Sequence, residues 1–157
     1  PNKNAIDYLA NILMPKLIKK IPQLKLILTG GGYDEKKSYI INAGIVSKPK
    51  LLNLIYNSKL MVVPIDKGTG TRIKIIEAML IGAKILTTKK GIEGISFKKS
   101  RFPIVLKKKL FYRSIVKNLK KNIKNKKTIQ FNNYYTMEKI VNNFFKNKHV
   151  ENIFKTN

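Results

Sequence analysis

The residues best suited to chemistry lie in one stretch, G-T-G-T-R-I-K-I-I-E-A-M, at positions 68–79. Glycine and threonine alternate at its start, Arg72 and Lys74 follow, and Glu77 is its one acid. Glycines let a ligand approach the backbone, and the free N–H groups at a helix start favour an anion, above all phosphate. If the stretch is a small-residue loop that opens a helix, it predicts a phosphate site with two added cations.

The carboxylate of Glu77 suits a different part of the same ligand. A carboxylate only accepts hydrogen bonds, and its two oxygens match adjacent hydroxyl groups such as those of a ribose. Phosphate donors and a diol acceptor together describe a site for a nucleotide diphosphate. The same residues also allow a purely structural interpretation, with Thr71 as an N-cap and Lys74 paired with Glu77 on the helix surface. Residue types alone leave both open, and the P-loop and G-x-G-x-x-G patterns are absent.

The elements that must position these residues alternate along the chain. Apolar runs predict strands, and segments with helical spacing predict helices. The expected strands are 24–29, 43–46, 60–65, 83–88 and 102–106, and the expected helices are 4–20, 34–41, 50–57 and 71–82. The strands are continuously apolar, which is typical of a parallel sheet covered on both faces. We therefore predict a doubly wound, Rossmann-like α/β domain, in which the loop after 60–65 lies at the ligand-binding edge.

The last third of the chain predicts helices. Apolar side chains recur at helical spacing over 111–123, with lysines mostly opposite, and a second helix is expected over 135–146. The first of these helices can pack on the core, or it can lie on a membrane surface with its lysines toward anionic lipid. We expect a nucleotide-sugar-binding domain at 1–108, helices packing on it at 109–147, and a tail at 148–157.

The composition limits the classes of binding partner that we expect. There are 33 Lys and Arg against 8 Asp and Glu, a formal charge of +25. This excess invites nucleic acid or an anionic membrane surface, but Arg, the usual reader of phosphates and bases, is rare. Lys, Ile and Asn are the residues that an AT-rich genome encodes, so nucleic acid is not expected. The chain has no Cys, and no apolar run approaches the roughly 20 residues of a membrane span. We expect a cytoplasmic protein, with a peripheral place on the inner membrane face as the second option.

The order of segments resembles the C-terminal, donor-binding domain of the group 1 glycosyl transferases, family 4, which have the GT-B fold. The resemblance covers about 1–147. It rests on L-K-L-I-L-T-G-G-G, on A-G-I-V-S-K-P-K-L-L-N-L-I-Y-N-S-K-L-M-V-V-P-I, and above all on G-T-G-T-R-I-K-I-I-E-A-M-L-I-G-A-K-I-L-T-T-K-K-G-I-E-G-I. The opening P-N-K-N-A-I-D-Y-L-A-N-I-L-M-P-K-L and the closing F-N-N-Y-Y-T-M-E-K-I-V-N-N-F-F resemble the first and last helices of that domain.

The resemblance implies a hexosyl transfer that retains configuration, from a UDP- or GDP-sugar to an acceptor, with no metal or other cofactor. Cell-surface polysaccharide or glycolipid synthesis is the implied setting. Arg72 and Lys74 are the expected catalytic residues, because they would stabilise charge that builds on the diphosphate leaving group. The expected donor-binding residues are Gly44, Ile45 and Val46 near the base, Gly68, Thr69, Gly70 and Thr71 at the diphosphate, and Glu77 at the ribose. Glu93 and Gly94 match a loop near the donor pocket.

Two features depart from the family's pattern. Thr69 stands where the first glutamate of a pair usually touches the sugar, so the sugar stays open. The family's domain starts with a further strand ahead of the segment that matches Pro1, and its N-terminal domain binds the acceptor, commonly with a catalytic His. The one histidine here is His149, in the tail. We therefore expect a piece of a larger enzyme or a split subunit, inactive and poorly stable alone. A basic binding module, or a nucleotide-sugar epimerase of the same fold, is the alternative.

Overall fold

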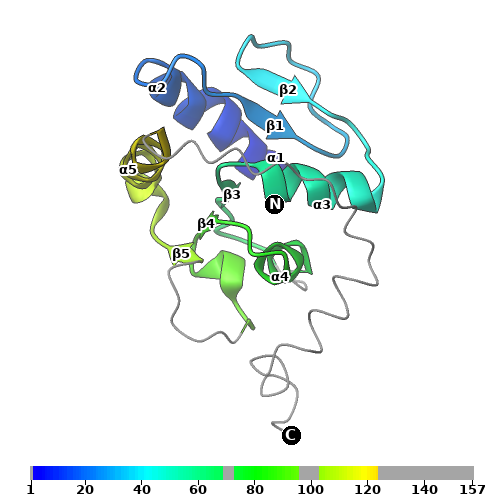
Figure 1. The fold of residues 1–157 in the computed structure, drawn as a ribbon. Helices are drawn as coiled ribbons and strands as arrows, with labels where there is room; N and C mark the ends of the chain where they lie inside the picture. Colours follow the sequence, from blue (N-terminus) through cyan, green and yellow to red (C-terminus); the bar gives the residue numbers. More distant parts are fainter. Residues whose placement is uncertain (1, 69–72, 96–102, 124–157) are drawn as a thin grey trace, which may run out of the picture.

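The computed structural model describes residues 2–68, 73–95 and 103–123. Helices and strands alternate along this part of the chain, as the sequence predicts (Figure 1). The helical segments are α1 (Asn2–Asp7), η1 (Tyr8–Leu13), α2 (Met14–Ile18), α3 (Lys48–Asn57), α4 (Ile73–Leu80), η2 (Lys90–Ile92), η3 (Lys108–Leu110) and α5 (Phe111–Ile123). The strands are β1 (Leu26–Leu28), β2 (Ile40–Asn42), β3 (Met61–Val63), β4 (Ile85–Thr87) and β5 (Ile104–Val105).

Every strand pair among the described residues is parallel, which confirms the predicted α/β, Rossmann-like class. The strands form two sheets, a two-stranded one in the order β1-β2 and a three-stranded one in the order β3-β4-β5. Leu26 lies opposite Ile40, and Met61 lies opposite Ile85. Within the described ranges, no strand pair joins β1 to β3, so the predicted sheet is divided in two.

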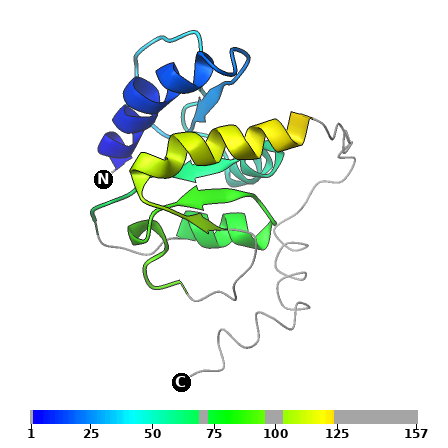
Figure 2. The ribbon, with the colours of Figure 1, turned by 90° about the vertical axis from the view of Figure 1, so that its left-hand side faces the viewer.

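The core is built on both faces of β4, because successive side chains of a strand point to opposite sides. Leu86 packs with residues of η1, α2 and α5, while Ile85 packs with residues of α3 and α4. Figure 2 shows α5 laid across strands of the three-stranded sheet. Leu26 of β1 and Val62 of β3 both pack against the cluster around Leu86, so the two sheets share a core without sharing a ladder.

Helix α5 packs on the core, which is one of the two positions that its sequence allows. Its apolar stripe is buried in the core, with Phe111, Ile115 and Leu119 almost fully shielded from solvent. The stripe is therefore used for packing and is not presented to a membrane surface. Among the helices that the structure describes, none is long and apolar enough to cross a bilayer. The second predicted helix, 135–146, lies outside the described residues.

Two predicted elements around residue 40 are wrong. The expected helix at 34–41 does not form, and the expected strand at 43–46 is a loop, because the strand β2 comes three residues earlier. The reason is nonlocal: Ile40 and Ile41 pair with β1, while Gly44 has a φ of 62°, which ends the extended run. The predicted strand therefore becomes the loop that follows β2.

The first helix is continuous, as expected, but its middle is a π-helix over Tyr8–Leu13. The N–H of Met14 donates to the carbonyl of Leu9, five residues back, where an α-helix would use the fourth. Leu9, Ala10 and Leu13 of this wider segment are buried. Tyr39, which leads into β2, donates its hydroxyl to the carbonyl of Ala10 at 3.1 Å. The wide turn is thus tied to the two-stranded sheet.

Candidate functional site

The predicted phosphate loop leaves the carboxyl end of β3. Gly68 has a φ of 110°, a conformation that favours glycine, so a bend occurs where the sequence predicts a small-residue loop. Lys74 lies exposed on the first turn of α4, and Glu77 lies one turn further along. The predicted Thr69, Gly70, Thr71 and Arg72 lie outside the described residues.

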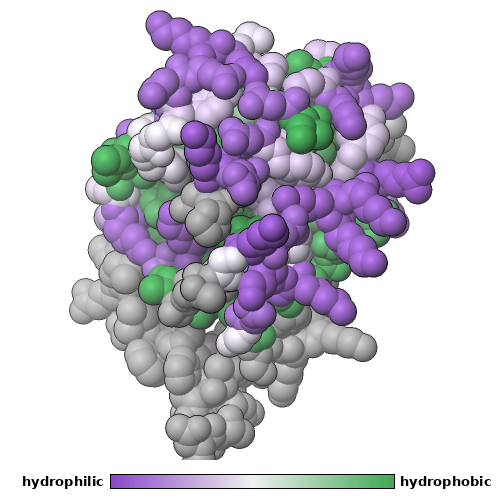
Figure 3. Space-filling view, turned by 180° about the vertical axis from the view of Figure 1, so that it is seen from behind, coloured by the Kyte–Doolittle hydropathy of each residue, from purple (hydrophilic) through white to green (hydrophobic). Residues whose placement is uncertain are grey.

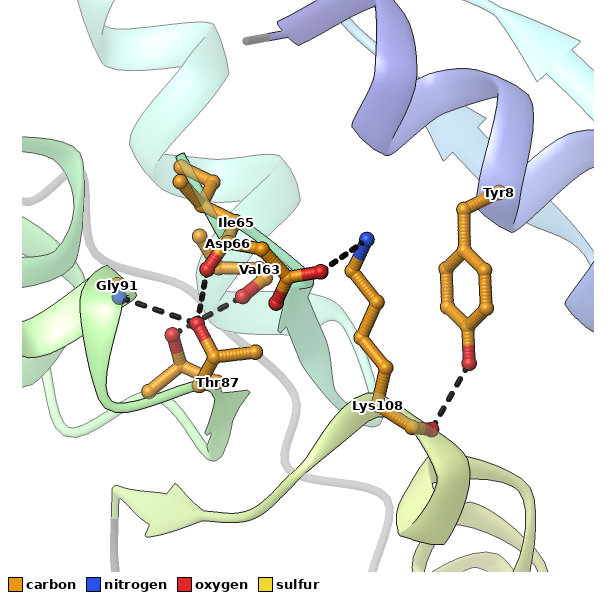
Figure 4. A network of polar contacts seen from close by, with 8 residues as sticks. Tyr8, Val63, Ile65, Asp66, Thr87, Gly91 and Lys108 are labelled. Carbon is orange, nitrogen blue, oxygen red and sulfur yellow. Dashed lines mark hydrogen bonds and ion pairs between the residues drawn. The ribbon is translucent and has the colours of Figure 1, made fainter. Parts of the chain in front are cut away.

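Two buried threonines fix the backbone that leads into this loop (Figure 4). The Thr87 hydroxyl, at the end of β4, donates to the Val63 carbonyl at 3.0 Å, and the Thr88 hydroxyl donates to the Ile65 carbonyl. The N–H of Gly91 in turn donates to the Thr88 hydroxyl oxygen at 3.1 Å. These bonds satisfy polar groups in an otherwise apolar core, which makes the end of β3 a fixed platform for the loop.

Gly91 is required at its position by space. A Cβ added there would lie 2.0 Å from the Thr87 hydroxyl oxygen and 3.5 Å from the Val63 carbonyl oxygen. Any side chain would therefore displace the Thr87 hydroxyl from its bond. Thr87, Thr88 and Gly91 are not among the predicted site residues, although two adjacent threonines that end an apolar strand indicate hydroxyl groups at the carboxyl edge of a sheet.

A second contact joins the loop after β3 to η3, the short helix that precedes α5. Asp66 pairs with Lys108 at 2.6 Å, and the Tyr8 hydroxyl donates to the Lys108 carbonyl at 3.0 Å (Figure 4). The Lys108 ammonium also lies 5.0 Å from the centre of the Tyr8 ring. Burial, and then the negative charge of Asp66, raise the pKa of Tyr8. No sequence signal links these residues, because they are brought together only by the fold.

The predicted base segment, Gly44 to Val46, follows the other sheet. The Gly44 carbonyl accepts from the N–H of Gly30 at 2.7 Å, so the loops that follow β1 and β2 lie against each other. The Asn42 side-chain oxygen accepts from the Gly44 N–H at 3.1 Å. The Ile45 side chain is 91% exposed, which is unusual for isoleucine. An apolar surface is thus presented to solvent beside a fixed backbone.

Glu77 is joined to that base segment by a residue that the sequence analysis did not name. Lys48, the first residue of α3 and two residues after Val46, pairs with Oε1 of Glu77. The Glu77 side chain is only 19% exposed, and its Oε2 is buried without a hydrogen-bond partner among the described residues. The structural alternative that the sequence left open, an ion pair of Lys74 with Glu77 within α4, is not found among the described residues, where Glu77 pairs with Lys48 of another helix.

The loop at Glu93 and Gly94 has a simpler environment. Glu93 pairs with Lys90 three residues earlier, and more than half of its side chain is exposed. Gly94 has a φ of 76°. Both residues lie just beyond Gly91 in the loop after β4, but nothing in the described part of the chain joins them to Glu77. In the same described residues no three Asp, Glu or His side chains gather as metal ligands, and metal-free transfer stays a prediction.

Comparison with known proteins identifies the family of this chain. A family model described as "Glycosyl transferases group 1" matches residues 1–109, which is more than half of the chain. The chain belongs to the group 1 glycosyl transferases. Membership in this glycosyl transferase family assigns glycosyl transfer as the general activity, with a nucleotide-sugar donor and an acceptor. No match was found among curated proteins, and none among solved structures.

Proposed function

We propose that this chain is the donor-binding part of a hexosyltransferase of the GT-B type. It would transfer a sugar from a UDP- or GDP-sugar with retention of configuration and without a metal, in cell-surface polysaccharide or glycolipid synthesis. The observation that carries the proposal is Glu77 Oε2, a buried carboxylate oxygen without a partner among the described residues, beside the exposed base segment. Buried polar atoms are nearly always hydrogen-bonded, so this oxygen fits a ligand's hydroxyl.

The chemistry of the proposed reaction suits the charges around α4. As the sugar leaves, negative charge builds on the nucleoside diphosphate, and the sugar becomes cation-like. Free N–H groups at the helix start, with the Arg72 and Lys74 side chains, would stabilise that developing charge more than the ground state. The fixed end of β3, held by Thr87 and Thr88, would keep the loop in place, so that little reorganisation is needed during the transfer.

The split sheet supports the proposal that a further strand completes the fold of this domain. Strands β1 and β3 are parallel to their own neighbours, are not paired to each other, and pack against one core cluster. That arrangement fits one further parallel strand between them, as the resemblance implies. We also propose an acceptor-binding domain for the complete enzyme, because transfer needs an acceptor and the resemblance implies such a domain, commonly with a catalytic histidine.

The net charge of +25 is consistent with an acceptor that is linked to anionic lipid. Hydrophilic side chains cover most of the described surface seen from behind (Figure 3). Because the apolar face of α5 is buried, membrane contact by this helix would depend on its lysines and on anionic lipid. The observations in the structure favour no second function over donor binding.

The test is a calorimetric titration of the full chain with UDP and with GDP. The unaltered chain is compared with Glu77→Gln and with a control, Glu35→Gln, whose exposed carboxylate pairs with Lys37. Hydrogen bonds to a charged group contribute about 1.5–3 kcal/mol, so Glu77→Gln should weaken binding by roughly 10-fold to 100-fold. Glu35→Gln should leave it unchanged. Equal affinity in Glu77→Gln, or no binding by a folded chain, would contradict the proposal.

A further inference from the structure

We propose that Lys48 is a positioning residue for the donor site, an inference that rests on the proposed function. Lys48 holds Oε1 of Glu77, and this leaves Oε2 to accept a hydroxyl of the donor's ribose. The two carboxylate oxygens thus have different partners, one from the protein and one from the ligand. The residue that divides their roles lies on α3, outside the helix that carries the carboxylate.

The position of Lys48 is poorly explained by the stability of its own helix. The first turn of α3 contains no acid, and it carries Lys48 and Lys50. Cations at a helix N-terminus face the positive end of the helix dipole, where an acid would be favoured. A lysine at this position therefore lowers the stability of α3. Its ion pair with Glu77 offsets this loss.

The residues on either side of Lys48 restrict its backbone, and this favours one position of the lysine relative to Glu77. Ser47 is extended, with a φ of −61° and a ψ of 155°, and Pro49 follows within the first turn of α3. Proline fixes its own φ near the helical value, so it stiffens the start of the helix. Only Ser47 separates Lys48 from Val46, the last residue of the base segment.

Glu77 needs such a partner because its side chain has three rotatable bonds. Without a cation, a carboxylate that is only 19% exposed gains by turning toward water, since burial of an unpaired charge is costly. That rotation would move Oε2 away from its buried position. Lysine is suited to the task because it only donates, so it cannot accept the O–H of the ribose hydroxyl in place of Glu77.

The test compares nucleotides with and without ribose hydroxyls. The full chain is titrated with UDP and GDP and with their 2′,3′-dideoxy counterparts. In the unaltered chain, loss of the hydroxyls should weaken binding by about 10-fold to 100-fold, the range for hydrogen bonds to a charged group. Lys48→Met keeps the stem but removes the cation, and it should bring this ratio close to one. Lys48→Arg keeps a cation and should retain most of the ratio.

Controls separate positioning from a general effect of charge. Lys50→Met removes the same charge from the same helix turn and should keep the hydroxyl ratio of the unaltered chain. Glu77→Gln should lose the ratio, and the double variant Lys48→Met/Glu77→Gln should lose no more than either alone, because both act on one contact. Each variant is checked for native dispersion by NMR before titration, and Lys48→Arg provides the folded comparison.

The outcomes distinguish this inference from the proposed function. If Lys48→Met keeps the full hydroxyl ratio, Lys48 does not position Glu77. If it weakens the ribose and dideoxy nucleotides equally, Lys48 touches another part of the ligand, and the inference is wrong although donor binding stands. If the unaltered chain binds neither UDP nor GDP, the proposed function fails, and the inference fails with it.

Discussion

The two sheets of this protein differ in how deeply their strands are buried and in how their ends are hydrogen-bonded. In the three-stranded sheet, β4 is fully buried, and threonine hydroxyls tie its end to the backbone around β3. In the two-stranded sheet, β2 is an edge strand, with Ile41 48% exposed. The proposed donor site takes Glu77 from the side of the first sheet and the base segment from the end of the second. The ion pair of Lys48 with Glu77, between α3 and α4, connects the two parts of this proposed site.

The largest difference should appear when an apolar side chain is shortened in each sheet. Leu86→Ala removes a side chain that is 0% exposed and should lower the free energy of unfolding by about 2–5 kcal/mol. Ile41→Ala, on the edge strand, should lower it by less than about 1 kcal/mol, because solvent already reaches that side chain. Urea denaturation of both variants measures the two values. Equal losses would show that the sheets are buried alike in solution.

The second test compares a glycine beside each sheet. Gly91→Ala places a methyl group 2.0 Å from the Thr87 hydroxyl oxygen, and overpacking of this kind costs about 1–3 kcal/mol. Gly31→Ala is the control, since a Cβ there meets nothing within 4 Å and the backbone φ is not in the positive region. Thermal unfolding should show a lower Tm for Gly91→Ala and little change for Gly31→Ala. A stable Gly91→Ala variant would mean that the Thr87 hydroxyl is free to rotate.

A smaller effect is expected where the first helix meets the loop region. Tyr8→Phe removes the hydrogen bond to the Lys108 carbonyl and should cost about 0.5–1.5 kcal/mol. Tyr112 packs against the same core cluster, and its hydroxyl makes no hydrogen bond to another described residue, so Tyr112→Phe should be nearly neutral. Chemical denaturation of the two variants side by side measures this difference. A larger loss for Tyr112→Phe would contradict the assignment of the bond to Tyr8.

The smallest effect should be a loss of stability at alkaline pH. Burial is the main cause that raises the pKa of Tyr8 and of Tyr33 above the usual value near 10, and Asp66 and Glu35 respectively add to the increase. A tyrosine with a raised folded-state pKa holds its proton longer in the native state than in the unfolded state. The free energy of unfolding should therefore be unaffected below pH 10 and fall as the pH rises past it. Stability measured from pH 8 to 11 should fall less steeply in Tyr8→Phe.

Where local pattern and fold agree, the sequence predicted the structure well. β4 is a continuous apolar run, and α5 has a clear stripe at helical spacing, so their periodicity is enough to place them. β2 was misplaced because two apolar stretches follow each other, and only the pairing of Ile40 and Ile41 with β1 decides between them. The pattern of one segment contains no information about its partner strand.

The candidate site shows the same division. The type of Glu77 and its place in a helix after a strand were enough to suggest its role, which stays a prediction. Lys48 could not be inferred, because it is 29 residues away and two loops and a strand lie between them. The contact of Tyr8 with Lys108 spans 100 residues. The sequence around Lys48 or Tyr8 therefore gives no sign of these contacts, whereas the type and spacing of Glu77 were enough to suggest a ligand.

The π-helical segment of the first helix is a place where the chain can lose one residue. A wide turn holds one residue more than an α-helical turn, so the loss of one codon within 8–13 would restore ordinary winding there. Because the wider winding absorbs one residue, the residues before and after the deletion would keep their faces, whereas the same deletion in an α-helical segment would rotate them by about 100° relative to each other. Tyr8 would still face Lys108. A one-residue deletion within this segment should therefore be tolerated better than a deletion in α3 or α5.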